Sequence, residues 1–333
     1  MKFVWKGGAL VAAALTCGSA SAQVPAAQRP VIASTAYFRF YSDPLYNLHD
    51  LLTWRTSGLR SAPSDSCATA SRVEWQSFAR AEQLYASKRG AERNRFMLAM
   101  RFEVAGFPGL GLQPDSIIAP ALALLNAALP AYRACWWEEH DRRNRSWIAQ
   151  LVPRLRAHED SIATRLARLY QNDWEQPFPV DVVTFASATG ASTIVEPHHI
   201  NISAADSSYR GDAALEMVFH EASHTIIGSK RDVIRRLLSD SAAIGTSQPP
   251  RDLGHVLLFY TTGRVTQQRL AETGTPGYEP YMYSEGVFDR AWPDLRAPVE
   301  RHWQPYLEGK TPLVAALRAI SAAVPRRTGR FPE

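Results

Sequence analysis

The 333-residue sequence contains few lysines and few cysteines. Only five of its 37 basic residues are lysine, and this arginine- and alanine-rich composition is typical of a GC-rich genome. The net charge of +5 therefore does not by itself indicate a nucleic-acid partner. Phosphate-binding glycine loops, nucleotide-binding fingerprints, serine nucleophile elbows and CxxC pairs are absent, as are internal repeats of solenoid or propeller length. The 46% of apolar residues is enough for a buried core and excludes a disordered chain.

The first 22 residues have the pattern of a secretory signal peptide. Lys2 and Lys6 form a basic start, Gly7–Leu15 is apolar, and Ala20-Ser21-Ala22 is a small-residue cleavage motif. The apolar stretch is too short to span a bilayer. We therefore expect cleavage near Ala22, export to the periplasm or the medium, and no stable membrane insertion.

Two of the three cysteines remain after this cleavage. Cys17 lies within the signal peptide, whereas Cys67 and Cys135 belong to the mature chain. A lone pair of thiols in an oxidising compartment more often forms a disulfide than a metal site or a nucleophile. Cys67 and Cys135 are therefore a candidate disulfide pair, and the sequence leaves open whether the two sulfurs meet.

The remainder of the chain falls into four segments, and the fold class is α+β. Residues 23–36 are rich in alanine and proline and indicate a loose leader. Residues 37–176 follow the helical period and form a helical N-terminal region, whereas residues 177–325 contain β-branched runs followed by helices. Residues 326–333 are a basic tail. We expect a predominantly helical protein with one small sheet.

The β-branched runs after residue 177 predict two strands ahead of a helix. Val180–Phe185 is the first, and Thr193–Val195 together with His199–Ile202 is the second after a turn. His198 and His199 lie in the second run. Adjacent residues of a strand point to opposite faces, so these two histidines do not chelate one ion together.

The following helix carries a metal-binding motif. Its buried stripe is formed by Leu215, Val218, Phe219, Ala222 and Ile226, and Gly228 is a natural stop. Beside the stripe lies His220-Glu221-Ala222-Ser223-His224. Histidines four residues apart project from one helix face and can share a tetrahedral zinc ion, while Glu221 lies close enough to act on a water bound there. The H-E-x-x-H pattern occurs by chance only ~0.01 times in a chain of this composition.

Through His220, Glu221 and His224 the sequence resembles the zincin metallopeptidases, over about a third of the chain. The resemblance implies that His220 and His224 bind zinc and that Glu221 is the general base. It also implies a zincin-like fold in which Thr193–Ile202 is an edge strand that pairs with an extended peptide substrate.

The third zinc ligand does not follow the known zincin patterns. Lys230 stands at the metzincin histidine position, and no glutamate occurs from Ala222 to Ala271, which excludes the short gluzincin spacing. We favour His255, because a helix is expected from Leu253 that would hold it in its first turn. Alternatives left open, with Asp240 and Glu285 foremost, are Asp232, Asp240, Asp252, Glu272 and Glu285.

Many zincins stabilise the oxyanion with a tyrosine or histidine. Tyr260, Tyr281 and Tyr283 are available, and we favour Tyr281. The sequence thus predicts an exported zinc-dependent peptidase that acts on peptide or protein substrates and has no nucleic-acid partner. Two alternatives remain: a catalytically quiet zincin-fold protein that binds metal or another ligand, and a zinc hydrolase of non-peptide amides or esters.

Overall fold

The computed structural model describes residues 29–58, 69–107, 114–174, 177–186, 190–228, 232–240, 250 and 252–324. The expected signal peptide, Cys67 and the basic tail lie outside these residues. Cys135 is disulfide-bonded.

The described residues form a mostly helical protein with one small mixed sheet, which confirms the α+β fold class. The strands are β1 (Val31–Ser34), β2 (Phe38–Tyr41), β3 (Phe178–Val183), β4 (Ala191–Ile194) and β5 (His199–Ser203). The first helices are α1 (Pro44–Arg55), α2 (Arg72–Ser87), α3 (Gly90–Ala105), α4 (Asp115–Tyr132), the π-helix η1 (Arg133–Trp137) and α5 (Glu138–Tyr170). The later helices are α6 (Gly211–Gly228), α7 (Val233–Ser239), α8 (Leu253–Glu272), α9 (Tyr281–Ser284), α10 (Val287–Ala291), α11 (Pro293–His302), α12 (Gln304–Leu307) and α13 (Leu313–Ala323).

The strand order in the sheet is β1-β2-β3-β5-β4. The three inner strands are parallel, and the two outer strands, β1 and β4, run antiparallel to their neighbours. The single strand expected over Thr193–Ile202 is wrong: residues 195–198 form a turn that separates the edge strand β4 from the inner strand β5. Pro197 lies in this turn and has no N–H to donate to a ladder, so the strand cannot run through it.

The loose leader expected over residues 23–36 is also wrong for its described part. Val31–Ser34 is β1, which pairs with β2. Arg29 reaches Asp181 of β3 with an N–O distance of 2.6 Å. A buried carboxylate needs a partner, and this ion pair ties the segment to the centre of the sheet.

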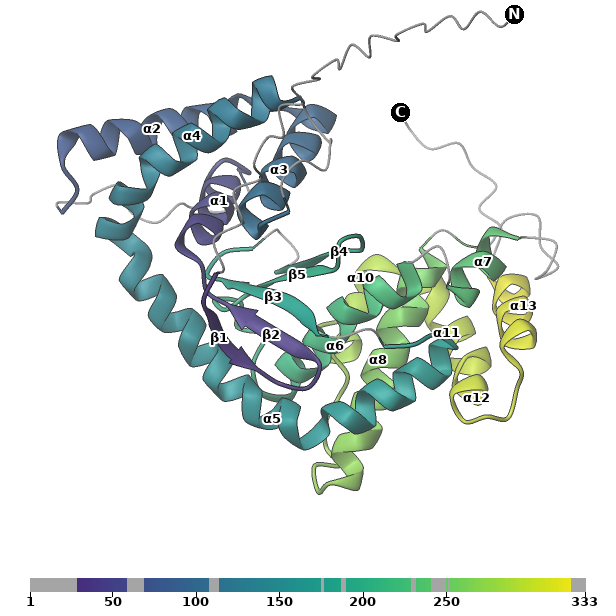
Figure 1. The fold of residues 1–333 in the computed structure, drawn as a ribbon. Helices are drawn as coiled ribbons and strands as arrows, with labels where there is room; N and C mark the ends of the chain where they lie inside the picture. Colours follow the sequence, from purple (N-terminus) through teal and green to yellow (C-terminus); the bar gives the residue numbers. More distant parts are fainter. Residues whose placement is uncertain are drawn as a thin grey trace, which may run out of the picture.

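Helices cover both faces of the sheet (Figure 1). α1 and α3 lie on one face, whereas α5 and α6 lie on the other. The larger core contains Phe38 and Phe40 of β2 together with the inner faces of α5, α6 and α8. A second core lies among α1, α2, α3 and α4. The expected division at residue 176 therefore does not separate the cores, because β2 and α5 belong to the core of the motif helix.

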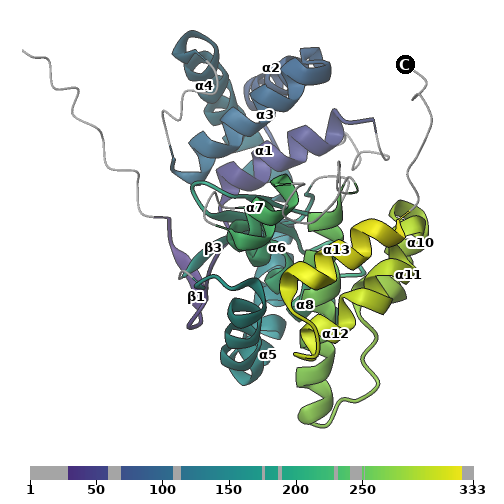
Figure 2. The same ribbon diagram turned by 90° about the vertical axis from the view of Figure 1, so that its right-hand side faces the viewer.

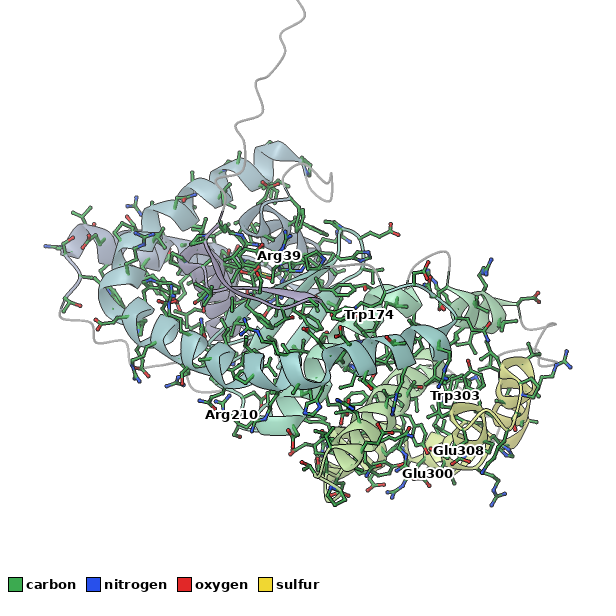
Figure 3. All side chains as sticks on the ribbon, turned by 60° about the horizontal axis from the view of Figure 1, so that its bottom comes forward. Arg39, Trp174, Arg210, Glu300, Trp303 and Glu308 are labelled. Carbon is green, nitrogen blue, oxygen red and sulfur yellow. The ribbon has the colours of Figure 1, made fainter. Side chains whose placement is uncertain are left out.

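The last helices support α8. Figure 2 shows α11, α12 and α13 gathered beside it. Trp303, labelled in Figure 3, is fully buried and donates from Nε1 to Oγ1 of Thr261 at 2.8 Å. This contact anchors the C-terminal helices to the middle of α8.

The helical run Ser116–Tyr170 is the one described segment long and apolar enough to cross a bilayer. A third of its most apolar 18-residue window is buried inside the protein. Core helices of soluble proteins share this length and composition, and buried residues of α4 belong to the second core.

Candidate metal site

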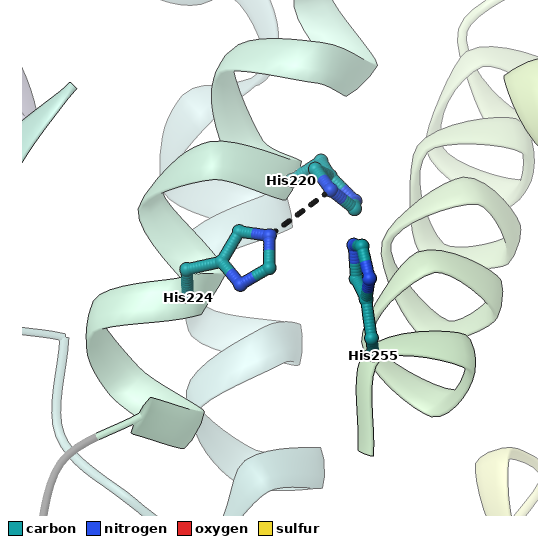
Figure 4. A group of neighbouring side chains, drawn as sticks. All are labelled: His220, His224 and His255. Atoms are coloured by element: carbon teal, nitrogen blue, oxygen red, sulfur yellow. Dashed lines mark hydrogen bonds between the residues drawn. The ribbon is translucent and has the colours of Figure 1, made fainter. Parts of the chain in front are cut away.

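The motif helix α6 forms as the sequence predicts. The five residues of its predicted stripe, Leu215 to Ile226, are all buried, and the helix ends at Gly228. The stripe faces the large core, so the neighbouring helix face is left for the two motif histidines. This face is turned toward α8 (Figure 4).

The structure brings His255 to the two motif histidines. α8 begins at Leu253, as predicted, and its stripe Leu253, Val256, Leu257 and Tyr260 is buried. One nitrogen from each of His220, His224 and His255 lies within 4.8 Å of the others. The Nε2 atoms of His220 and His224 are 3.3 Å apart (Figure 4). The described residues contain no other group of three possible metal ligands at such spacing.

All three imidazoles are held in the neutral form that binds metals. His220 is buried, whereas His224 and His255 are partly open to solvent. Burial lowers the pKa of His220 well below its usual value, with further lowering by the two neighbouring histidines. Burial lowers the pKa of His224 to about 3 and also lowers the pKa of His255. The ring of Phe259 packs against His220, with 3.9 Å between the two ring centroids.

The three histidines fit a zinc ion by geometry and by donor chemistry. Two nitrogens bound tetrahedrally at about 2.05 Å from zinc lie ~3.3 Å apart, which matches the His220–His224 distance. The described residues give the nitrogens of His220 no partner other than His224. The Nδ1 atom of His220 is buried without a hydrogen bond, and its Nε2 atom faces only His224.

The alternative ligands do not join this group. Asp232 caps α7 by accepting from the backbone N–H groups of Ile234 and Arg235, and Glu272 pairs with Arg165 at 2.7 Å. Asp240, Asp252 and Glu285 do not belong to the group either.

The adjacent His198 and His199 likewise lie outside the group. His199 is buried and its Nε2 atom is 2.6 Å from Oδ2 of Asp181.

The side chain of Glu221 extends from the motif helix α6 to the edge strand β4. Its side chain is 5% exposed, and its Oε2 atom accepts from the Thr193 hydroxyl at 2.6 Å. Burial raises the pKa of Glu221 to about 7, although this hydrogen bond and the positive charge of Arg101 act in the opposite direction. The strand expected to line a cleft thus reaches the motif glutamate directly.

Among the three candidate tyrosines, Tyr281 is the one that stacks on Phe259, which contacts a motif histidine. Its ring stacks on Phe259 at 6.0 Å, and Phe259 contacts His220. Its hydroxyl is 2.9 Å from Oγ of Ser208. The other two candidates bond elsewhere: Tyr260 donates to Gln304 and Tyr283 donates to Glu300.

Glu216, which no sequence motif marks, holds the segment that carries Tyr281. It is fully buried on α6, one turn before His220. Its Oε2 atom accepts from the Tyr278 hydroxyl at 2.7 Å and from the Tyr281 backbone N–H at 3.1 Å. Burial raises its pKa to about 7. The spacing of 216, 220 and 224 along one helix face is the signal that points to it.

Two further residues, Tyr209 and Arg101, are distant from Glu221 in sequence but are brought near it by tertiary packing. Tyr209 is 2% exposed, and its ring lies 5.6 Å from that of Tyr281. Arg101 of α3 donates from Nη1 to Oγ of Ser192, which precedes Thr193 in β4, at 2.8 Å. Both are far from the motif in sequence, and no local pattern identifies them.

Comparison with known proteins finds no match: no family model, no curated protein and no solved structure is significantly similar to the chain.

Proposed function

We propose that this protein is an exported zinc-dependent hydrolase with a zincin-like catalytic region, and that it cleaves peptide or amide bonds. The observation that supports this most directly is the convergence of His220, His224 and His255 beside a buried Glu221. Three histidines with a neighbouring carboxylate are the ligand set and the base of a catalytic zinc site rather than a structural one, which has four protein ligands.

Each histidine has the position and protonation state of a ligand. His220 and His224 come from one helix and His255 from another, so the packing of α6 against α8 fixes the distance between them. Zinc bound by such residues supplies Lewis-acid chemistry and lowers the pKa of water to about 7.

Glu221 is placed to move a proton. The Thr193 hydroxyl donates to its Oε2 atom, so Oε1 is the carboxylate oxygen that this bond does not engage. Oε1 is thus the atom that takes a proton from the attacking water and passes it to the leaving amine. Tyr281 is the donor that we propose for the developing oxyanion, because its ring is held beside the site through Phe259.

The test combines metal analysis with turnover. We expect purified protein to contain one zinc per chain and to cleave a mixture of unstructured peptides, with cleavage lost on adding a chelator. Glu221→Gln should retain the zinc and lose turnover by at least ~100-fold, because the proton acceptor is removed. Glu138→Gln is the matched control, since Glu138 is exposed on α5, and it should retain full activity.

Three outcomes would contradict parts of this proposal. Protein without stoichiometric zinc would overturn it. A zinc-loaded protein with no hydrolytic activity would identify a binding protein. Cleavage of small amides or esters without cleavage of peptides would retain the zinc chemistry and change the substrate class.

A further inference from the structure

A fixed positive charge lies at the edge strand, beside the candidate site. Arg101 belongs to α3, which lies on the opposite face of the sheet from α6 (Figure 1). Its guanidinium reaches β4, where Nη1 donates to Oγ of Ser192 at 2.8 Å. The next residue of β4 is Thr193, which binds the carboxylate of Glu221. Arg101 and Glu221 are therefore attached to neighbouring residues of one strand.

A buried network holds this guanidinium in place. Asp50 of α1 is 2% exposed, and its Oδ1 atom lies 3.7 Å from Nη2 of Arg101. The amide of Asn201, on β5, donates to the other oxygen of Asp50. Contacts from α1, β4 and β5 thus fix the position of Arg101, which is what a preorganised binding group requires.

Among the described residues, Arg101 donates few of the hydrogen bonds that its guanidinium could make. A guanidinium has five N–H donors, and the Nη1–Ser192 bond is the only one made within the described part of the chain. The 3.7 Å separation between Nη2 and Asp50 is too long for a hydrogen bond, and Nε is buried without a partner. The side chain is 14% exposed, so part of it faces solvent.

The edge strand β4 determines where a bound substrate peptide would meet the guanidinium of Arg101. Of the strands that the structure describes, β4 pairs with β5 alone. Its side chains alternate between the two faces, so that Ser192 points to Arg101 and Thr193 points to Glu221. A chain lying along this edge would meet Arg101 within a residue or two of the point where it meets Glu221.

We propose that Arg101 binds a carboxylate of the substrate next to the scissile bond. This inference rests on the proposed function. Arginine binds carboxylates through charge-assisted and often paired hydrogen bonds, which a neutral amide cannot replace. The substrate class is therefore peptides with aspartate or glutamate beside the cleaved bond, or with a free C-terminus at that place.

The experiment compares matched peptides. Starting from one peptide that the zinc-loaded protein cleaves, aspartate is exchanged for asparagine at each position flanking the scissile bond, with both ends blocked. A further pair differs only in a free or an amidated C-terminus. We expect kcat/KM to be about tenfold or more higher for the carboxylate member of one pair. The pair that responds identifies the source of the carboxylate.

The role of Arg101 is then tested by substitution. Arg101→Gln should abolish the difference between the paired peptides, and Arg101→Lys should restore part of it. Arg39→Gln is the matched control, because Arg39 is an exposed arginine of β2 (Figure 3), and it should retain the full preference. Since Arg101→Gln leaves Asp50 without its cation, the double variant Arg101→Gln/Asp50→Asn serves if the single variant does not fold.

Binding separates this inference from the proposed function. Affinity of the same peptides is measured on the zinc-loaded Glu221→Gln protein. A carboxylate preference in binding that depends on Arg101, without cleavage by the wild-type protein, supports the inference and overturns the proposed hydrolase. Equal binding and equal cleavage of the paired peptides, or a preference that survives in Arg101→Gln, overturns the inference.

Discussion

The hydroxyl of Thr193 lies 2.6 Å from Oε2 of Glu221 and links the edge strand to the motif helix. Because this bond orients the carboxylate, we expect Thr193→Val to lower kcat by about tenfold, which corresponds to the loss of one hydrogen bond to a charged group. The steady-state rate on a cleaved peptide measures it.

Thr193→Ser is the control for this prediction. Serine retains a hydroxyl at the same place and should retain most of the activity. Both variants should bind zinc as the wild type does, since Thr193 is not among the three histidines. A Thr193→Val protein with unchanged kcat would show that the edge strand does not orient Glu221.

His255 is the ligand that the sequence leaves least certain, so its removal is the sharpest test of the metal site. Losing a residue that only supports a ligand weakens metal binding by 10–100-fold, so losing a ligand should cost on the order of 100-fold or more. We expect this loss for His255→Ala in a competition titration with a chromogenic chelator. His302→Ala, on α11, should bind zinc with unchanged affinity. Equal affinities for the two variants would show that the third ligand is another residue.

Glu216 should make the stability of the zinc-free protein depend on pH. Its pKa is raised to about 7 by burial in the folded state, from about 4.5 in an unfolded chain. Between these values the folded state holds a proton that the unfolded state releases. The free energy of unfolding should therefore fall as pH rises from about 4.5 to 7, by an amount on the order of 3 kcal/mol, and should be unaffected by this group outside that window.

The contribution of Glu216 is measured as a difference between variants. Urea unfolding across this pH range, in the presence of a chelator, should give a weaker pH dependence for Glu216→Gln than for the wild type. Glu138→Gln, which changes an exposed carboxylate, should behave as the wild type. Identical slopes for all three proteins would mean that Glu216 ionises normally in the folded state.

Gly263 sets the distance between α8 and the chain that carries Tyr281. A Cβ atom at this position would lie 2.8 Å from Cβ of Pro280 and 3.1 Å from Oε1 of Glu216. We expect Gly263→Ala to destabilise the protein by about 1–3 kcal/mol in denaturant unfolding, because the overlap forces the backbone apart. Among the described residues, Gly254→Ala in the same helix meets Leu238 alone, at 3.4 Å, and should be close to neutral. A stabilised Gly263→Ala protein would contradict this packing.

The sequence predicts the bounds of helices better than it predicts which strands pair. The stripe periods predicted the buried face of α6 and the start of α8 at Leu253, because both depend on residues within a few turns. The single edge strand implied over Thr193–Ile202 is wrong, because residues 195–198 form a turn and His199–Ser203 lies inside the sheet as β5. The leader over residues 23–36 was wrong in part, because composition does not show that β1 has a partner strand.

The sequence by itself determined the pair of histidines and the glutamate, because residues three and four apart on a helix share a face whatever surrounds them. It also placed His255 on a helix, although it could not bring that helix to α6. The packing of distant segments brings the three imidazoles together, buries Glu216 beside Tyr281, and places Arg101 against Ser192. These relationships join segments distant along the chain, and they depend on how α3, α6 and α8 pack rather than on any local pattern.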